Sequence, residues 1–288
     1  MARWLVTGAT GCVGRATVAA ARSAGHDVVG LARRAAEIDA PLVVGRIEDA
    51  AAIERATQGR DVVVHLAGWV HRLPETAADQ AALRTSIIEG TRHVARAARA
   101  ARARLIAAST VAVHETTPYG RAKLEAEKVV RELCPDALLL RIVHVYGPHD
   151  RGNMAALAQA VASRRAVVVG DGENKKSMVY VDNLADRVVL GAERRVAGTF
   201  VASDGAPTQR EILAALTGAL GRRPLPRVPL AAARLGARLL GGRWPDRVEK
   251  LAATTAFDGG PLDTLLDYRP RISLDEGMRR ELEWLCLI

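Results

Sequence analysis

Aromatic residues and cysteines are the scarcest components of this 288-residue chain. It contains two Phe, four Tyr and four Trp, so its core must be built from Ala, Val and Leu. The three cysteines, Cys12, Cys134 and Cys286, lie far apart and have no metal-ligand spacing. This pattern argues against a disulfide framework or a cysteine metal site, and it favours a reducing compartment.

Long apolar runs are also missing. No stretch of 18 or more apolar residues occurs, so we expect no membrane-spanning segment and no membrane partner. The first predicted strand begins without the apolar stretch and cleavage site of a signal peptide, so we expect a cytoplasmic protein. Apolar residues make up 49% and charged residues 25%, which are ordinary values for a globular protein.

Lysine is rare, and arginine carries most of the net charge of +9. A positive surface favours phosphorylated ligands. The densest basic run, between Arg92 and Arg104, is interleaved with Ala at helical spacing and lacks aromatic residues on which bases would stack. We interpret this run as a solvated helix face and expect no nucleic-acid partner.

The first half of the chain alternates short apolar runs with Ala-rich segments, which indicates a doubly wound, parallel α/β sheet. The predicted strands are Arg3–Val6, Val28–Ala32, Leu42–Gly45, Val62–Leu66, Leu105–Ser109 and Leu138–Val143. The predicted helices are Gly14–Ala24, Ala50–Thr57, Ala78–Ala101 and Tyr119–Leu133. The apolar runs of the predicted strands are nearly continuous, which is typical of strands that helices cover on both faces.

The pattern changes after Gly147 and Pro148, where proline breaks and short helices become frequent. We expect residues 1–150 to form a dinucleotide-binding domain, with strands near 178–202 returning to its sheet. Residues 151–177 and 203–288 are predicted to form a smaller, substrate-binding lobe.

A glycine-rich turn follows the first predicted strand and opens the first predicted helix. Gly8, Gly11 and Gly14 suit a tight turn, close backbone approach to phosphate and close helix packing. The helix N-terminus then offers unpaired N–H groups to a pyrophosphate. The predicted cofactor contacts in this turn are Gly8, Thr10, Gly11, Cys12, Val13 and Gly14.

The end of the second predicted strand bears on the choice of dinucleotide. An acidic residue there would accept hydrogen bonds from the adenine ribose and favour NAD, whereas this chain has Ala32 followed by Arg33 and Arg34. Because a guanidinium grips a phosphate in bidentate fashion, we predict NADP, with NAD as the alternative. The alternative interpretation is that Arg33 and Arg34 are ordinary surface charges of an arginine-rich chain.

Further cofactor contacts are expected where other strands end. Asp49 either hydrogen-bonds the adenine amino group or caps the following helix, and both interpretations stay open. The remaining predicted contacts are Ile47, Leu66, Ala67, Gly68, Ile142 and Val143. The loop Trp69–Arg72 either covers the nicotinamide or is an ordinary surface loop.

Tyr119 and Lys123 lie four residues apart on a predicted helix, so their side chains share one face. A free phenol has a pKa near 10, and a neighbouring ammonium lowers this pKa by stabilising the phenolate. Tyr119 and Lys123 are both predicted cofactor contacts as well, and Lys123 is suited to hold the nicotinamide ribose. A hydroxyl from Ser109 or Thr110 at the end of the fifth strand would bind the substrate oxygen.

Taken together, the glycine turn and the Tyr119–Lys123 pair resemble the extended short-chain dehydrogenase/reductase superfamily, within its NAD(P)-dependent epimerase/dehydratase group. Further segments are similar over nearly the whole chain: Asp61–Ala67, Leu140–Pro148, Ser177–Asn183 and Leu266–Gly277. The resemblance implies a Rossmann-like fold, hydride transfer at the nicotinamide, and dimerisation through the helices near 78–101 and 119–133.

The resemblance also implies residue roles. It makes Tyr119 the acid–base group, Lys123 its partner and Thr110 the catalytic hydroxyl, with Ser109 the weaker choice. Lys176 occupies a place where such enzymes often carry an arginine for a nucleotide-sugar phosphate. His144 lies where several of them use a ligand-binding asparagine, so it is either a substrate contact or a packed strand-end histidine.

Some positions depart from the family pattern. Ile87 stands where the family's N-x-x-G-T motif has asparagine, and the connection from Thr110 to Tyr119 is short. These departures weaken the prediction of a nucleotide-sugar enzyme more than that of a reductase. Our leading hypothesis is an NADP-dependent oxidoreductase that interconverts a carbonyl and a secondary alcohol. The alternatives are a nucleotide-sugar epimerase or dehydratase that retains its dinucleotide, and a cofactor-binding regulatory or non-redox protein.

Overall fold

The computed structural model describes residues 1–68, 76–242 and 244–288, which divide into two compact units. The first unit comprises residues 1–143, 181–202 and 259–269, and the second comprises residues 144–180, 203–258 and 270–288. The first unit therefore ends earlier than the predicted boundary at 150. It also regains Gly259–Arg269, because the buried Arg187 forms an ion pair with Asp263 at 2.7 Å.

The first unit is built on a seven-stranded sheet with the order β10-β6-β5-β4-β1-β2-β3, and every neighbouring pair is parallel. The strands are β1 (Arg3–Thr7), β2 (Asp27–Ala32), β3 (Leu42–Val44), β4 (Val62–His65), β5 (Arg104–Thr110), β6 (Leu138–Ile142) and β10 (Gly198–Ala202). The order reverses between β1 and β4, so the carboxyl ends of these strands form the edge at which open α/β sheets bind ligands. The predicted parallel α/β fold is confirmed.

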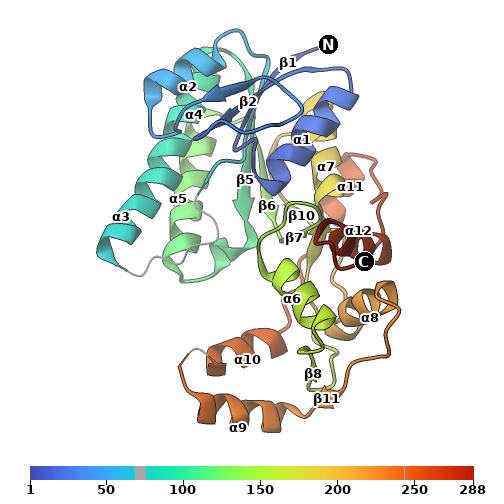
Figure 1. The fold of residues 1–288 in the computed structure, drawn as a ribbon. Helices are drawn as coiled ribbons and strands as arrows, with labels where there is room; N and C mark the ends of the chain where they lie inside the picture. Colours follow the sequence, from blue (N-terminus) through green and yellow to red (C-terminus); the bar gives the residue numbers. More distant parts are fainter. Residues whose placement is uncertain (69–75, 243) are drawn as a thin grey trace. The chain divides into compact units, whose positions relative to one another are not determined.

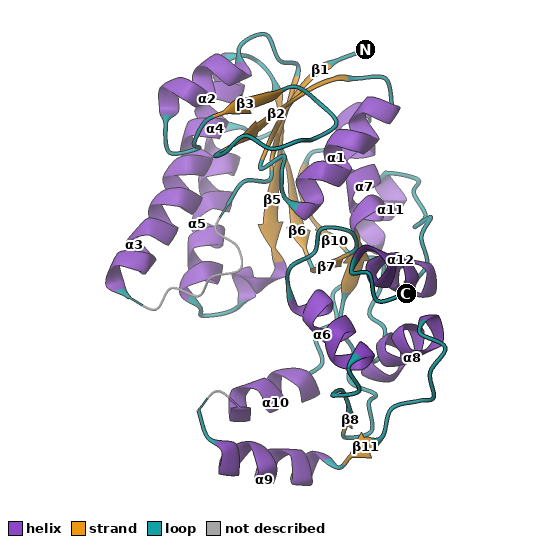
Figure 2. Cartoon of the chain, viewed as in Figure 1, coloured by secondary structure: helices purple, strands orange, loops and turns teal. Residues whose placement is uncertain are grey.

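Helices cover both faces of this sheet (Figures 1 and 2). On one face lie α1 (Cys12–Ser23), α7 (Val181–Glu193) and the short α11 (Gly260–Leu265). On the other lie α2 (Ala50–Thr57), α3 (Ala77–Arg84), the π-helical turn η1 (Thr85–Glu89), α4 (Gly90–Ala100) and α5 (Pro118–Leu133). The short 3-10 helix η2 (Val111–His114) connects β5 to α5.

The core under α4 is aliphatic, as the shortage of aromatic residues requires. Leu5, Val63 and Leu105 lie side by side across β1, β4 and β5 and are at most 2% exposed. They pack with Val94 of α4 and Val130 of α5 in one buried cluster. This packing holds the two helices against the strand ends.

The second unit contains two small sheets and five helices within the described residues. The sheets pair β7 (His144–Tyr146) with β9 (Met178–Tyr180), and β8 (Val168–Val169) with β11 (Arg227–Val228). The helices are α6 (Asn153–Ala162), α8 (Gln209–Ala219), α9 (Leu230–Leu240), α10 (Trp244–Ala252) and α12 (Leu274–Trp284). In α12, Gly277 leaves room for the rings of Tyr146 and Tyr180, since a β-carbon there would lie 2.7 Å from Tyr146.

Two predicted elements differ from the structure. Of the two strands expected to return to the main sheet, only β10 does so; β9 pairs with β7 instead, because β10 already occupies the free edge of β6. The single helix predicted over 78–101 is interrupted by η1, where the β-branched residues Thr85, Ile87 and Ile88 crowd the preceding turn.

Candidate active site

The glycine turn between β1 and α1 leaves no space for side chains at two of its positions. Gly8 has a positive φ of +71°, and a β-carbon on it would lie 2.8 Å from the Ala67 nitrogen. A β-carbon on Gly14 would lie 2.2 Å from the Gly8 carbonyl oxygen. Among the described residues no side chain caps α1, and its first turn, which includes the half-buried Cys12 and Val13, holds no acidic residue. The turn therefore fits a pyrophosphate.

The end of β2 carries the two arginines that the sequence places near an adenine ribose. Arg33 and Arg34 are exposed, and neither has a hydrogen bond or ion pair within the described part of the chain. A neighbouring arginine was not singled out from the sequence. Arg15 donates to the carbonyl of Thr10 at 3.3 Å and to that of Glu37 at 2.9 Å, so it ties the loop after β2 to the glycine turn.

The residues after β3 have clear structural tasks. Asp49 caps α2 by accepting a hydrogen bond from the Ala52 nitrogen at 3.1 Å, as one of its two interpretations predicts. The Ile47 side chain is buried against Gly90, so a cofactor would meet its backbone. Leu66, Ala67 and Gly68 are half-buried beyond β4. The loop Trp69–Arg72 lies outside the described residues.

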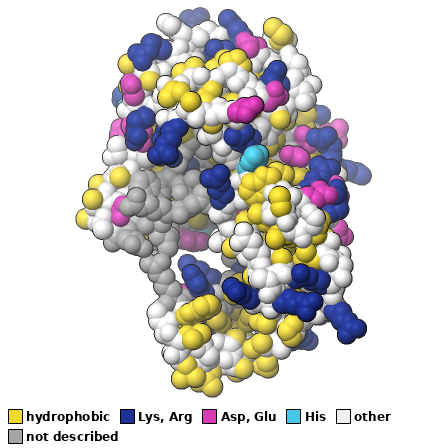
Figure 3. Space-filling view, viewed as in Figure 1, with side chains coloured by type: hydrophobic (Ala, Val, Ile, Leu, Met, Phe, Trp, Pro, Cys, Tyr) yellow, Lys and Arg dark blue, Asp and Glu magenta, His cyan; other side chains and the backbone are white. Residues whose placement is uncertain are grey.

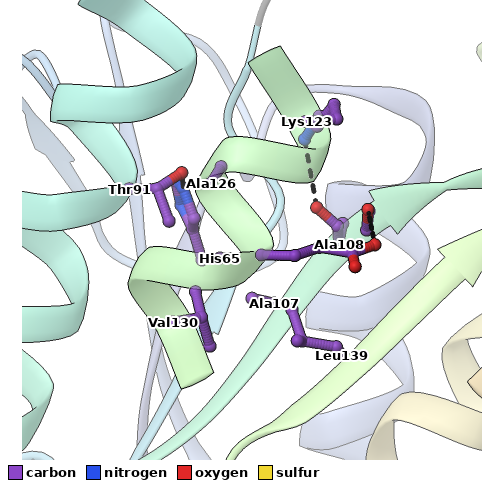
Figure 4. Close-up of a pocket in the computed structure, with 10 residues that line it drawn as sticks. His65, Thr91, Ala107, Ala108, Lys123, Ala126, Val130 and Leu139 are labelled. Carbon is purple, nitrogen blue, oxygen red and sulfur yellow. Dashed lines mark hydrogen bonds between the residues drawn. The ribbon is translucent and has the colours of Figure 1, made fainter. Parts of the chain in front are cut away.

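The first turn of α5 follows from local capping rules. Thr117 accepts a hydrogen bond from the Gly120 nitrogen at 3.0 Å, and Pro118 occupies the first helical position. One turn later, the buried Lys123 ammonium donates to the carbonyl of Ala108 on β5 at 3.0 Å (Figure 4). A β-carbon on Gly68 would lie 3.6 Å from this ammonium, so β4, β5 and α5 converge on Lys123.

Burial sets the protonation of this pair. It lowers the pKa of Lys123 to about 8, against the opposing effect of the Glu127 charge. It raises the pKa of the half-buried Tyr119 phenol. The Lys123 ammonium therefore loses its proton near pH 8. The pKa of Tyr119 lies above its ordinary value, opposite to the lowering that the sequence predicts from the neighbouring ammonium, because burial dominates.

The two candidate hydroxyls on β5 have different surroundings. The Ser109 hydroxyl is buried and donates to the Glu127 carboxylate at 2.6 Å. Thr110 is half-buried, and its hydroxyl oxygen accepts from the Ala112 nitrogen at 3.2 Å, which caps η2. Successive side chains of a strand point to opposite faces. Thr110 therefore keeps a hydroxyl hydrogen for a ligand, whereas Ser109 is engaged inside the protein.

A small cavity of about 10 Å³ is lined by Lys123 together with residues of β4, β5 and α5 (Figure 4). His65 on its wall is buried and bridges Thr7 at 2.9 Å and Thr91 at 3.1 Å. Burial, together with the Lys123 charge, lowers the pKa of His65 to about 3. His65 is thus a neutral structural residue.

Ile87 is buried in η1 where the family pattern has an asparagine. It belongs to an apolar cluster with Leu83, Ala122 and Val129, against which Tyr119 packs. This cluster supplies the desolvation that raises the Tyr119 pKa. Apolar packing replaces a polar group at this side of the phenol.

Two of the predicted substrate contacts lie in the second unit. His144 is exposed at the start of β7. Lys176 donates to the carbonyls of Lys250 at 2.7 Å and Ala253 at 2.6 Å, so its ammonium caps the carboxyl end of α10. Ile142 and Val143 follow each other at the end of β6 in the first unit, half-buried and buried respectively.

Other site classes find no support in the described residues. They contain no group of three or more His, Cys, Asp or Glu side chains arranged to hold a metal ion. None of their helices combines the length and hydrophobicity needed to cross a bilayer. Lys and Arg side chains are scattered over the face shown in Figure 3 and form no single patch there.

Glu127 is a site residue that the sequence analysis missed. It follows Lys123 by one helical turn, is 1% exposed, and contacts Ser109 and Arg141. The signal available in the sequence was its spacing of four from Lys123, which places both on one helix face. Its partners on other strands were not visible.

Comparison with known proteins places this geometry in context. The model of the NAD dependent epimerase/dehydratase family matches residues 4–201. A ceramide reductase from Caulobacter vibrioides is 30% identical over 230 residues, covering 76% of this chain and 71% of the relative. A 3-diazoavenalumate denitrifying reductase from a Streptomyces species is 31% identical over 274 residues, covering 83% and 87%.

Solved structures share the fold. A UDP-glucuronic acid 4-epimerase from Bacillus cereus, in complex with NAD, superposes with a TM-score of 0.77 at 20% identity and covers 99% of this chain and 98% of its own. The family match extends from β1 to β10 and includes both the glycine turn and the Tyr119–Lys123 pair. The chain belongs to the NAD-dependent epimerase/dehydratase family of NAD(P)-dependent enzymes.

Proposed function

We propose that this enzyme is an NADP-dependent oxidoreductase that interconverts a carbonyl and a secondary alcohol. The observation that carries the proposal is the position of Lys123. Its ammonium is held at the end of β5 by the Ala108 carbonyl, beside Gly68 and one helical turn from Tyr119. The two relatives described above are both named reductases, which supports a reduction as the reaction.

Different residues of the first unit bind the dinucleotide, bind the substrate oxygen and transfer the proton in the proposed reaction. The glycine turn and the N-terminus of α1 hold the pyrophosphate of the dinucleotide, which when bound supplies hydride to the carbonyl carbon. Thr110 donates its hydroxyl hydrogen to the carbonyl oxygen, because its own oxygen already accepts from Ala112. Tyr119 transfers a proton to the same oxygen, and the Lys123 ammonium stabilises the phenolate that remains.

A substitution of the phenol tests this assignment. We expect Tyr119→Phe to lower NADPH consumption with a ketone by about 100-fold or more, the usual contribution of a positioned acid. Cofactor affinity should change far less than activity, since the glycine turn and Lys123 still bind the dinucleotide in this mechanism. Full activity in the variant would refute the role of Tyr119.

The preference for NADP rests on Arg33 and Arg34, which are exposed and have no described partner. Their guanidinium groups suit the 2′-phosphate, and the preceding Ala32 offers no carboxylate to a ribose hydroxyl. Competitive binding should favour NADP over NAD, and the double variant Arg33→Ala/Arg34→Ala should lose that preference. Tighter binding of NAD by the native chain would contradict the proposal.

A nucleotide-sugar epimerase with a retained dinucleotide is the second candidate. The fold shared with an NAD-bound UDP-glucuronic acid 4-epimerase favours it. Ala32, Ile87 and His144, which replace family residues, count against it. Such an enzyme would purify with bound dinucleotide and turn over without added cofactor, whereas the reductase requires added NADPH. Cofactor binding without turnover of either kind would point to a regulatory role.

We further propose that the second unit binds the small-molecule substrate and that the protein works as a cytoplasmic homodimer. The exposed His144 in β7 is a candidate substrate contact in this unit. Lys176 is a weaker one, because two of its three ammonium hydrogens are already engaged on α10. Sedimentation equilibrium tests the dimer, and a monomer at micromolar concentration would exclude it.

A further inference from the structure

Glu127 is a buried carboxylate to which the proposed reaction assigns no role. It lies on α5 four residues beyond Lys123, which is itself four residues beyond Tyr119. Residues with this spacing share one helix face. Its side chain is 1% exposed, and a carboxylate so buried is costly unless hydrogen bonds and opposite charges compensate.

Compensation for this burial comes from three elements. Ser109 on β5 donates to Oε1 at 2.6 Å. Arg141 on β6 donates from Nε to Oε1 at 2.9 Å and from Nη2 to Oε2 at 2.8 Å, a bidentate pair. Arg131, one turn further along α5, donates to Oε2 at 3.1 Å. Although burial alone raises the pKa of Glu127, these hydrogen bonds bring it below its ordinary value, so the group is ionised at neutral pH.

Lys123 and Glu127 line the same small cavity, together with His65, Thr91 and Ser109. The cavity has a volume of about 10 Å³, close to the space that one water molecule needs. Because the Lys123 and Glu127 side chains are themselves buried, water screens their charges only weakly. His65 is neutral, since burial and the lysine charge lower its pKa to about 3.

Among the described residues, the other titratable or charged groups near Lys123 and Glu127 lie on α5, β6 and η2, and none of them is a second anion. Tyr119 on α5 is protonated, because burial raises its pKa. Arg131 and Arg141 are cations bound to Glu127, and His114 of η2 lies 3.5 Å from Arg141. Glu127 is therefore the negative group that acts on Lys123 from the described residues.

We propose that Glu127 is a positioning residue that keeps Lys123 charged beside Tyr119, and that Ser109 and Arg141 hold the carboxylate in place for this purpose. The proposal rests on the proposed function, in which Tyr119 and Lys123 form the acid–base pair. Glu127 touches neither substrate nor cofactor and acts through the lysine. The same carboxylate engages the Ser109 hydroxyl, which donates to it inside the protein.

Removal of the Glu127 charge alone gives the sharpest test. In Glu127→Gln, the amide oxygen still accepts from Ser109, but burial and the uncompensated Arg141 act on Lys123 without opposition. We expect the pKa of Lys123 to fall by roughly one unit, as for the loss of an opposite charge nearby. The descending limb of the pH profile for carbonyl reduction should move to lower pH by the same amount, with little change in KM.

The lysine content of the chain allows a direct measurement. Only five lysines are present, so 13C-labelled lysine gives a simple NMR spectrum in which Lys123→Gln identifies the signal of Lys123. The matched control is Glu125→Gln, which makes the same chemical change on α5 but at a half-exposed residue paired with Arg84. The Lys123 titration midpoint should fall in Glu127→Gln and stay unchanged in Glu125→Gln.

A second variant reverses the sign of the effect. In Arg141→Gln, Glu127 keeps its charge and loses its closest cation, so the Lys123 midpoint should rise. This variant decides the question if Glu127→Gln fails to fold. An unshifted Lys123 midpoint in a folded Glu127→Gln or Arg141→Gln variant would overturn the proposal, even if the stability changes. Because the NMR titration needs no turnover, an inactive native enzyme would refute the proposed reductase function and leave this test intact.

Discussion

Gly120 and the carbonyl of Ala112 are in direct contact, because a β-carbon on Gly120 would lie 2.2 Å from that oxygen. Ala112 belongs to η2, the turn that follows Thr110, and Gly120 follows Tyr119 in the first turn of α5. The close approach of these two turns brings the end of β5 and the first turn of α5 together, as the short connection between Thr110 and Tyr119 requires.

The first prediction concerns this contact. We expect Gly120→Ala to lower the free energy of unfolding by about 1–3 kcal/mol, the usual cost of overpacking, and to reduce kcat by displacing Tyr119. Urea denaturation and steady-state kinetics measure the two effects. Gly218→Ala is the matched control in α8, where no heavy atom lies within 4 Å of the added carbon, and it should stabilise the protein by about 0.4–1 kcal/mol. Changes of the same sign in both variants would contradict the assignment.

The second prediction concerns the pH dependence of activity. The pKa of Lys123 is about 8 because the ammonium is buried. Since kcat/KM reports the ionisation of groups in the free enzyme, kcat/KM for carbonyl reduction should fall as pH rises above about 8. Lys128→Gln, which removes an exposed charge from the same helix, should leave the profile unchanged. A native profile that stays flat to pH 9.5 would count against a role for Lys123.

The third prediction follows from the same pKa through folding. The unfolded lysine has a pKa near 10.5, so between pH 8 and 10.5 the unfolded chain binds more protons than the folded chain. The contribution of Lys123 to stability therefore increases with pH across this window. At pH 7 we expect Lys123→Met to be more stable than the native protein, and the difference should shrink as pH approaches 10. Thermal unfolding at a series of pH values measures it, and a difference that grows with pH would have the wrong sign.

Some of the features behind these predictions can be predicted from the sequence, and others depend on how the chain folds. The spacing of Tyr119 and Lys123 and the glycines at 8 and 14 are local, because a single helix or turn determines what each residue faces. Two partners of Glu127 come from other elements: Ser109, 18 residues before it, and Arg141, 14 residues after it. Which strands lie beside α5 decides these contacts, and periodicity alone carries no such information.

In the second unit, too, local sequence does not determine which distant residues come into contact. Lys176 was assigned from its place in a motif, yet its ammonium is engaged with carbonyls more than 70 residues further along the chain. The strand Met178–Tyr180 has the apolar composition of a sheet strand, but its partner depends on which edges are vacant. The sequence therefore predicted a strand near residue 178, but the prediction that it joins the main sheet was wrong.

The fourth prediction concerns Ile87, the apolar residue at the family's asparagine position. Ile87→Asn places an amide in the cluster that packs on Tyr119, so it should cost about 2–4 kcal/mol of stability and lower the pKa of Tyr119 towards its ordinary value. The rising limb of the pH profile for alcohol oxidation should then move to lower pH. Ile87→Val, which removes one methylene, should cost about 1 kcal/mol and leave the profile in place. A shift in both variants would show that packing, not polarity, sets the pKa.

The fifth prediction concerns acid stability. His65 is buried between Thr7 and Thr91, and burial together with Lys123 lowers its pKa from 6.5 to about 3. Between these values the unfolded chain binds the proton and the folded chain does not, so the stability contributed by His65 is lost as pH falls below about 6.5. From pH 7.5 to 5 this loss amounts to roughly 2 kcal/mol.

His65→Gln removes the titrating group and should make the unfolding free energy less sensitive to acid over that range, although its value at pH 7.5 will be lower because the hydrogen bonds to the two threonines are disturbed. Urea unfolding at each pH gives both quantities. Equal acid slopes for the native protein and His65→Gln would show that His65 takes up a proton in the folded state, and the neutral bridge between Thr7 and Thr91 would then be wrong.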